Sequence, residues 1–308
     1  MKRKTETSEL IFRIIAYTIL VIFALLCIYP LLYALVSMFS NADAITRGEI
    51  IIWPVGFQTE AFMHVINEPR FWISYANTLF VTFIGTMWCL LYSILGAYAL
   101  SKKRLVGRHG FNFFLVFTMW FSAGIIPQFM NYNATGRIMA QVFAGTSDMT
   151  AIDLKWLIVL AMGMNATNII LLRNAFEGVP SEIEEAARID GATELQILTK
   201  VYIPMSKATI ATVALFFGIS RWNGYFWAYK VTLSQEYSWP VQVFIRDHIE
   251  KNTNLTGKYT PESAEMGQGI GAAIAYALVI FAMIPILVIY PFIQKYFAKG
   301  VNMGGVKE

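Results

Sequence analysis

Six apolar runs, each close to the length that crosses a lipid bilayer, constrain this chain more than any other feature. About 20 apolar residues in a helix span the hydrocarbon core. Such runs form helices, because a spanning segment must satisfy its backbone hydrogen bonds internally. The runs cover roughly 14–39, 78–100, 111–129, 156–172, 205–220 and 270–292. They predict an all-α polytopic membrane protein, in which residues 1–308 form a single transmembrane domain of about six helices.

The composition agrees with a membrane protein. Hydrophobic residues make up 56% of the chain and charged residues only 14%, whereas soluble domains average about 25% charged residues. The fourth and fifth runs are the weakest, since Asn165, Asn168 and Ser220 interrupt or end them. The first run is longer than the apolar part of a cleavable signal, about 7–15 residues, so we expect a retained span. Cys27 and Cys89 form neither a disulfide framework nor a metal motif.

The placement of Lys and Arg predicts the orientation, because cytoplasmic loops carry an excess of these residues. Fifteen of the 24 Lys and Arg residues lie at the N-terminus, after the second and fourth runs, and in the C-terminal tail. The other nine, Arg221 among them, are spread over the segments between. We therefore predict that both termini are cytoplasmic and that about 40–77 and 221–269 form large external loops.

A short polar segment, about 177–204, carries the strongest local signal. Ser181 followed by Glu184 has the spacing of a capping box, which predicts a helix over about 182–190. Gly191 supplies the left-handed residue that ends a helix sharply. A second helix is expected from Thr193, the start of another capping box, to the residue before Pro204. The segment therefore predicts a cytoplasmic helix-turn-helix.

The first of these helices offers a surface for another protein. Ala186 and Ala187 are small enough for close approach, and charged residues surround them. The charged residues are Glu184, Glu185, Arg188 and Asp190. Charges at the rim of an interface tune register and specificity more than affinity. From the residues alone, a solvated surface helix is the alternative interpretation.

This segment resembles the EAA motif of the permease subunits of binding-protein-dependent ATP-binding-cassette (ABC) importers. The matching residues are Glu185-Ala186-Ala187, Gly191 and Val201-Tyr202-Ile203-Pro204, with Val201 where the motif usually has Ile. Residues 172–176 and 183–192 resemble the carbohydrate branch of these permeases. Two further stretches, 121–127 and 290–307, resemble a subgroup that imports complex oligosaccharides. The polar stretch 131–150 is less apolar than the resemblance leads us to expect.

The resemblance implies the type I importer permease fold, in a bacterial cell membrane, with a cytoplasmic coupling helix inserted into an ATPase subunit. It implies an ATPase-coupling role for Glu184, Glu185, Ala186, Ala187, Arg188, Asp190, Gly191 and Pro204. The expected partners are a second related permease, two ATPase subunits, a solute-binding protein at the external loops, an oligosaccharide and membrane lipid, but no nucleic acid. The tail from 295 to 308 would reach toward the ATPase dimer interface.

Cofactors are expected only on the partners. The chain contains no G-x-x-x-x-G-K-[ST] phosphate loop, so ATP and Mg would bind to the ATPase subunits and this chain would not be an enzyme. The three histidines lie in predicted loops without zinc spacing. An ion-coupled secondary transporter of a small polar solute is the alternative, although such transporters hold ionisable groups inside their spans and the predicted spans here avoid Asp and Glu.

Candidate pathway residues are the polar and aromatic side chains in or beside the later spans. Polar groups inside a membrane mark transport pathways by default. The candidates are Asn165, Asn168, Trp222, Asn223 and Tyr225. Hydrogen bonding between helices for the two Asn residues and anchoring at the membrane interface for the aromatic residues are the alternatives. The identity of the sugar does not follow from these residues.

Overall fold

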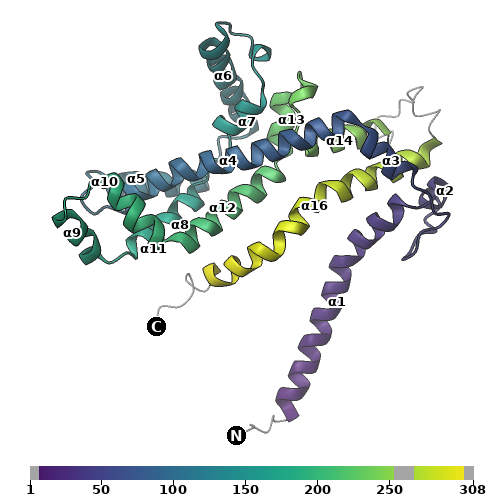
Figure 1. Cartoon of the computed structure of the whole chain (residues 1–308), viewed down its shortest axis with the longest axis horizontal. Helices are drawn as coiled ribbons and strands as arrows, with labels where there is room; N and C mark the ends of the chain where they lie inside the picture. Colours follow the sequence, from purple (N-terminus) through teal and green to yellow (C-terminus); the bar gives the residue numbers. More distant parts are fainter. Residues whose placement is uncertain (1–6, 253–266, 302–308) are drawn as a thin grey trace. The chain divides into compact units, whose positions relative to one another are not determined.

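The computed structural model describes residues 7–252 and 267–301, and every regular element within them is helical. The chain divides into two compact units, one formed by 1–69 with 245–284 and the other by 70–244 with 285–308. Two helices, α14 (Val241–Asn252) and α16 (Gly267–Val301), contribute to both units. Figure 1 follows the helices along the chain. The prediction of an all-α protein is confirmed for the described residues.

The first unit is organised around aromatic side chains. Its elements are α1 (Thr7–Met38), α2 (Ala42–Thr46), α3 (Glu60–Asn67) and the adjoining parts of α14 and α16. The ring centroids of Tyr33 in α1 and Tyr276 in α16 lie 5.7 Å apart, edge to face. Phe62 in α3 stacks on Phe281 of α16 with centroids 5.5 Å apart. Only 6% of the span window of α1 is buried among the residues that the structure describes, as expected for a helix whose side chains face lipid.

The second unit packs around two apolar clusters. Besides the short helical pieces within 181–205, which are described below, its elements are α4 (Pro69–Ser101), α5 (Arg108–Trp120), α6 (Ile125–Ala144), α7 (Lys155–Ala161), α8 (Ala166–Glu177), α12 (Lys207–Trp222) and α13 (Phe226–Thr232), with short turns η1 (Met149–Ala151) and η3 (Glu236–Ser238). One cluster includes Val81, Leu157 and Trp239. The other includes Leu172 and Phe217. Because α4 contributes to both clusters, it is the central element of this unit.

Three helices of the described chain are long and apolar enough to cross a membrane, and they confirm the first, second and sixth predicted spans. They are Glu9–Met38, Pro69–Ser101 and Gly271–Pro291. Three bent helix pairs raise the number of candidate spans to six if each pair is one span. The second span begins earlier than predicted, since α4 starts at Pro69. The predicted loop 40–77 therefore contains helices.

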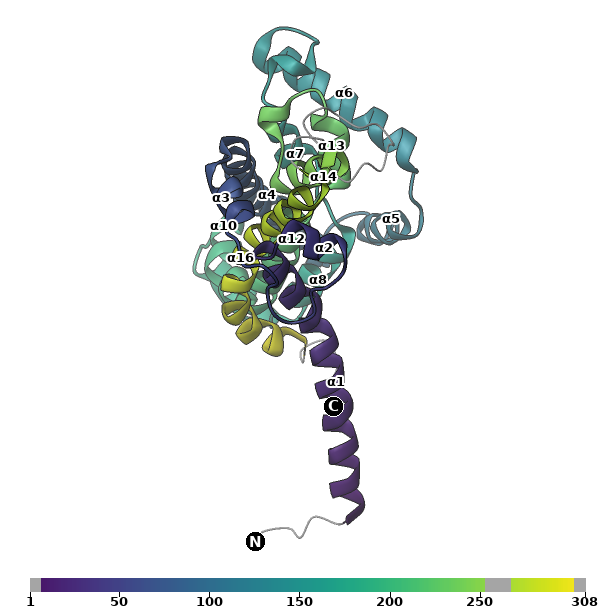
Figure 2. The ribbon, with the colours of Figure 1, turned by 90° about the vertical axis from the view of Figure 1, so that its right-hand side faces the viewer.

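The third predicted span, 111–129, is wrong as a single helix. α5 ends at Trp120 and α6 begins at Ile125, with an angle of 117° between them, and Figure 2 shows the two helices joined by a sharp turn. Gly124 has φ of 88°, which supports the turn because glycine tolerates positive φ. α5 alone, at 13 residues, extends about 20 Å, which is shorter than the hydrocarbon core. Much of the polar stretch 131–150 lies in α6.

The fourth and fifth predicted spans are also divided. α7 and α8 are separated by four residues and bent by 45°, while the helix over Glu194–Met205 meets α12 at 85°. Arg221 was assigned to an external loop, and this assignment is wrong: it lies near the end of α12 and is only 8% exposed. The predicted loop 221–269 likewise contains α13, η3 and α14, although 253–266 lie outside the described residues.

Candidate functional site

The polar segment forms four short helical pieces at one end of α4, as Figure 1 shows. They are α9 (Ser181–Ile189), α10 (Glu194–Ile197), the π-helical turn η2 (Leu198–Tyr202) and α11 (Ile203–Met205). Gly191 has φ of 79° between α9 and α10, which confirms the predicted left-handed residue. We name the residues from Ser181 to Met205 the hairpin segment.

One of the two predicted capping boxes is present. Thr193 accepts a hydrogen bond from the backbone of Gln196, whose side chain accepts one from the backbone of Thr193. The other prediction is wrong, because Pro180 is the cap residue of α9 and makes no side-chain bond. Glu184, the predicted partner of Ser181 in that box, is instead directed toward the loop that follows α4.

The second predicted helix does not end before Pro204, which corrects a further boundary. The chain stays helical through Pro204 to Met205. A proline inside a helix lacks an N–H and clashes with the preceding turn. The wider π turn accommodates this residue, since the backbone N–H of Ile203 bonds to the carbonyl of Leu198, five residues back. The hairpin segment is therefore continuous, apart from Ser206, with the start of α12.

Glu184 is the centre of a partly buried ion cluster. Its Oε2 lies 2.8 Å from Nζ of Lys102, and it also accepts a hydrogen bond from the hydroxyl of Tyr202. Its Oε1 lies 2.5 Å from Nη2 of Arg188, one turn later in α9. The side chains of Lys102 and Glu184 are only 9% and 16% exposed. This shielding from solvent strengthens the attraction relative to a surface ion pair.

A second carboxylate, Glu194, extends the cluster to the start of α10. Its Oε1 lies 2.5 Å from Arg104 and 3.1 Å from Arg188, and its Oε2 accepts a hydrogen bond of 2.8 Å from Tyr98. The Lys102 ammonium also lies over two rings, 4.2 Å from the centroid of Tyr98 and 3.9 Å from that of Tyr202. Cation–π contacts of this kind add to the ion pairing. We name the seven residues Tyr98, Lys102, Arg104, Glu184, Arg188, Glu194 and Tyr202 the anchor cluster.

The electrostatics of the anchor cluster keep its carboxylates ionised. Burial alone raises the pKa of Glu184, but the hydrogen bonds from Lys102 and Tyr202 and the charge of Lys102 outweigh burial and lower its pKa to about 2. The hydrogen bond from Arg104 lowers the pKa of Glu194. Burial lowers the pKa of the Lys102 ammonium, against the opposing effect of Glu184. The hairpin segment is therefore held to the α4 end by charge.

The opposite side of α9 is exposed. Glu185, Ala186 and Asp190 face solvent, and the Ile189 side chain, which the sequence did not single out, is 87% exposed. Ala187 is half-buried and packs against the apolar cluster around Leu172 and Phe217. Pro204 is also exposed. The residues predicted to couple to an ATPase therefore separate into two groups. Glu184, Ala187 and Arg188 contact the rest of the unit, although Arg188 is itself exposed. The outer group is exposed and consists of Glu185, Ala186, Asp190, Gly191 and Pro204.

The sequence did not predict most of the anchor cluster. Lys102 and Arg104 counted only among the basic residues after the second apolar run, Tyr98 lies inside that run, and Tyr202 lies in the EAA-like stretch. Lys102 and Glu184 lie 82 positions apart, so periodicity within a helix carries no signal for their contact. Their opposite charges in two loops predicted on the same side of the membrane were the available signal.

The predicted pathway residues do not form one cluster in the described contacts. Asn165 is the cap residue of α8, and its Oδ1 accepts a hydrogen bond of 3.3 Å from the backbone of Asn168. Asn168 and Trp222 are buried, whereas Asn223 is exposed. The Tyr225 ring stacks on that of Tyr229, with centroids 5.6 Å apart.

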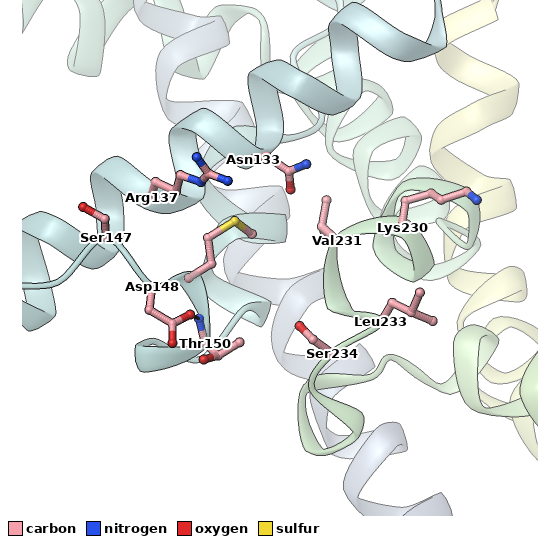
Figure 3. A pocket seen from close by; sticks show the side chains of 10 residues that line it. Asn133, Arg137, Ser147, Asp148, Thr150, Lys230, Val231, Leu233 and Ser234 are labelled. Carbon is pink, nitrogen blue, oxygen red and sulfur yellow. Dashed lines mark hydrogen bonds between the residues drawn. The ribbon is translucent and has the colours of Figure 1, made fainter.

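A pocket of about 590 Å³ lies elsewhere in the second unit, between α6 and α13. Figure 3 shows Asn133 and Arg137 on α6, with Asp148 and Thr150 on the loop that follows. Asp148 is engaged by the backbone N–H of Thr150 at 2.9 Å, and this bond lowers its pKa. No predicted site residue lines the pocket. Within 7–252 and 267–301, no three His, Cys, Asp or Glu side chains group closely enough to hold a metal ion.

Comparisons with known proteins agree on one family. Residues 3–303 match the family model described as binding-protein-dependent transport system inner membrane component. The chain is 34% identical over 300 residues to the polygalacturonan/rhamnogalacturonan transport system permease protein YtcP of Bacillus subtilis (strain 168), covering 96% of this chain and 98% of the relative. It is 32% identical over 282 residues to protein LplC of the same organism, covering 91% and 89%.

A solved structure is similar over nearly the whole fold. It is the crystal structure of a bacterial ABC transporter involved in the import of the acidic polysaccharide alginate. One of its chains matches with a TM-score of 0.81 and 39% sequence identity, covering 95% of this chain and 98% of that chain.

Proposed function

This chain belongs to the family of binding-protein-dependent transport system inner membrane components and is a permease of a sugar-importing ABC transporter, and we propose that its hairpin segment docks into an ATPase partner. The family is a membrane permease rather than an enzyme. The ion-coupled alternative is not retained, since the family match spans 3–303.

The observation that carries this proposal is the division of α9 into a held side and a free side. Glu184 is held to the end of α4 through Lys102, while Glu185 and Ala186 are exposed on the same short helix. Because packed elements move as units rather than deforming continuously, a movement of the ATPase partner bound to the exposed side of α9 would be transmitted to α4 through the attached side. The exposed Ile189 supplies apolar contact area for such a partner.

The partners follow from this assignment. We propose two ATPase subunits, which bind ATP and Mg, a second related permease, and a solute-binding protein that delivers the cargo. The hairpin segment and the basic loop after α4 then face the cytoplasm, as do both termini. The predicted tail, 295–308, lies in α16 up to Val301 and otherwise outside the described residues.

The proposed cargo is an acidic oligosaccharide. Two of the similar proteins support this class: one is named for polygalacturonan and rhamnogalacturonan, and the other serves alginate import. Galacturonan and alginate carry a carboxylate on each uronate residue. The pathway is proposed to include Asn165, Asn168, Trp222, Asn223 and Tyr225, whose amide groups and rings suit hydrogen bonding to, and stacking on, sugars.

Reconstitution tests the proposal. The chain would be co-expressed with its partner permease, ATPase and binding protein and purified as a complex. The complex would be placed in lipid vesicles, with ATP on the side of the membrane where the hairpin segment lies. We expect uptake of labelled oligogalacturonides, with unlabelled oligouronates competing and neutral malto-oligosaccharides failing to compete. Equal competition by both classes would contradict the acidic cargo but leave the importer intact.

A further inference from the structure

Arg221 is a buried cation that lies beside the middle of α4, the central helix of the second unit. It lies near the end of α12 and is 8% exposed. Its Nη2 lies 3.2 Å from the sulfur of Cys89, and a Cβ atom added to Gly85 would lie 3.1 Å from its Nε. Gly85 is the middle residue of α4, a candidate membrane span. A charge at such depth is costly and marks a functional position by default.

The guanidinium is bound by the end of a broken helix. It donates hydrogen bonds to the carbonyl oxygens of Ile158 and Met162, and another of 3.2 Å to that of Val159. These carbonyls lie at the C-terminal end of α7, where a helix leaves its last four carbonyls without helical partners. The negative end of the helix dipole lies there as well. Arg221 therefore supplies hydrogen-bond donors to the carbonyls that are left without helical partners at the break between α7 and α8.

The fit around the guanidinium is close and specific to arginine. Gly163, inside the break, has φ of 93°, and a Cβ atom there would lie 2.6 Å from Nη2 of Arg221. Among the residues that the structure describes, no carboxylate lies within ion-pair distance of Arg221. Its charge is thus stabilised by three backbone carbonyls at one helix end, which the two terminal nitrogens of a planar guanidinium reach together and a single ammonium cannot.

We propose that Arg221 is a positioning residue for transport: its guanidinium holds the α7–α8 break against α4 and so fixes Asn165 and Asn168 beside the pathway. Asn165 closes the break as the cap of α8, and Asn168 is buried one turn later. Irregular backbone at membrane depth is tolerated where protein buries it or where it lines a cavity. The inference rests on the proposed importer function.

The test uses the complete importer in membrane vesicles. Cys27→Ser leaves Cys89 as the only cysteine of this chain. The rate at which N-ethylmaleimide labels Cys89 then reports whether Arg221 still shields its sulfur. The variants are Arg221→Lys and Gly163→Ala, and Arg47→Lys is the matched control because the Arg47 side chain is 70% exposed. Uptake of oligogalacturonide, ATP hydrolysis and labelling of Cys89 are measured for each.

We expect Arg221→Lys to lower uptake about tenfold or more while ATP hydrolysis stays within about twofold, because the loss falls on positioning rather than on assembly. Cys89 labelling should become about tenfold faster, and Gly163→Ala should shift uptake and labelling in the same direction. Arg47→Lys should leave all three readouts unchanged. Wild-type uptake together with protected Cys89 in Arg221→Lys would overturn the inference. If Arg221→Lys does not accumulate in the membrane, wild-type uptake together with protected Cys89 in Gly163→Ala would overturn the inference instead.

The labelling readout keeps this inference separate from the importer assignment. The rate at which maleimide labels Cys89 does not depend on whether the cargo is an oligouronate. Absence of uptake with the wild-type chain would therefore count against the proposed function. Rapid labelling of Cys89 in the wild-type chain would count against the Arg221 contact itself.

Discussion

The Glu184 carboxylate of α9 lies 2.8 Å from the Lys102 ammonium at the end of α4, which joins the hairpin segment to the central helix of the second unit. The remaining anchor-cluster residues surround this pair with two more cations, a second carboxylate and two aromatic rings. Because the exposed side of α9 carries the proposed docking residues, force applied there would reach α4 through this contact.

The first prediction concerns the stability of that pair. Glu184→Met and Lys102→Met should each lower the free energy of unfolding by about 1–3 kcal/mol, because each leaves a shielded charge without its partner. The double variant with both substitutions should recover much of this loss, giving a coupling energy of about 1 kcal/mol or more. Unfolding in mixed detergent measures all three variants and the wild type.

The exposed pair Arg13–Glu9 provides the control for the cycle, since its side chains are 56% and 50% exposed. Removing it should change the free energy of unfolding by about 0.5 kcal/mol or less. Purely additive effects of the Lys102 and Glu184 substitutions would show that the contact does not stabilise the fold.

The second prediction concerns pH. The pKa of Glu184 is about 2 in the folded chain against 4.5 in the absence of its partners. Ionised Glu184 therefore contributes stability that is fully present above about pH 4.5 and is lost as the pH falls toward about 2. The difference in thermal unfolding temperature between wild type and Glu184→Gln should be constant from pH 5 to 7 and shrink below pH 4.5. A difference that grows on acidification has the wrong sign for this account.

The third prediction concerns Gly191. Its φ of 79° is left-handed, and a Cβ atom there would meet nothing within 4 Å. Gly191→Ala should therefore cost only the backbone strain, about 1–2 kcal/mol, and reduce uptake partially. Gly191→Pro should abolish uptake, because proline fixes φ near −65°, while membrane insertion persists. Normal uptake by Gly191→Pro would show that the turn between α9 and α10 is not needed for coupling.

The fourth prediction separates capping from cargo binding at Asn165. Asn165→Asp keeps an acceptor for the backbone of Asn168, so stability should be retained, whereas Asn165→Ala should lose about 1 kcal/mol. If Asn165 also lines the pathway, the added carboxylate should repel an acidic cargo and raise its KM. Unchanged uptake by Asn165→Asp would remove Asn165 from the proposed pathway.

The sequence predicts the long elements well because their signal is local. Continuous apolar runs predict α1, α4 and α16, and the Thr193 capping box and Gly191 turn depend on residues only a few positions apart. The same rule fails at Ser181, because the long-range contact of Glu184 with Lys102 replaces the local cap. Spacing within a helix does not encode which distant charge captures a carboxylate.

The remaining errors have related causes. The 117° turn between α5 and α6 follows from the backbone at Gly124, which a count of apolar residues does not register. Arg221 was placed outside because orientation rules count charges, whereas its burial depends on carbonyls freed by a helix break more than 50 residues away. Both features belong to tertiary structure rather than to sequence pattern.

The most direct test of the central claim is recovery of the ATPase with the tagged chain from mild detergent, compared between Ala186→Trp and Ala134→Trp. Both alanines are exposed on helices, but only Ala186 lies on the proposed docking side of α9. Docking through α9 predicts that Ala186→Trp inserts into the membrane and loses the ATPase, while Ala134→Trp retains it. Recovery of the ATPase at wild-type level with Ala186→Trp would contradict the coupling role of the hairpin segment.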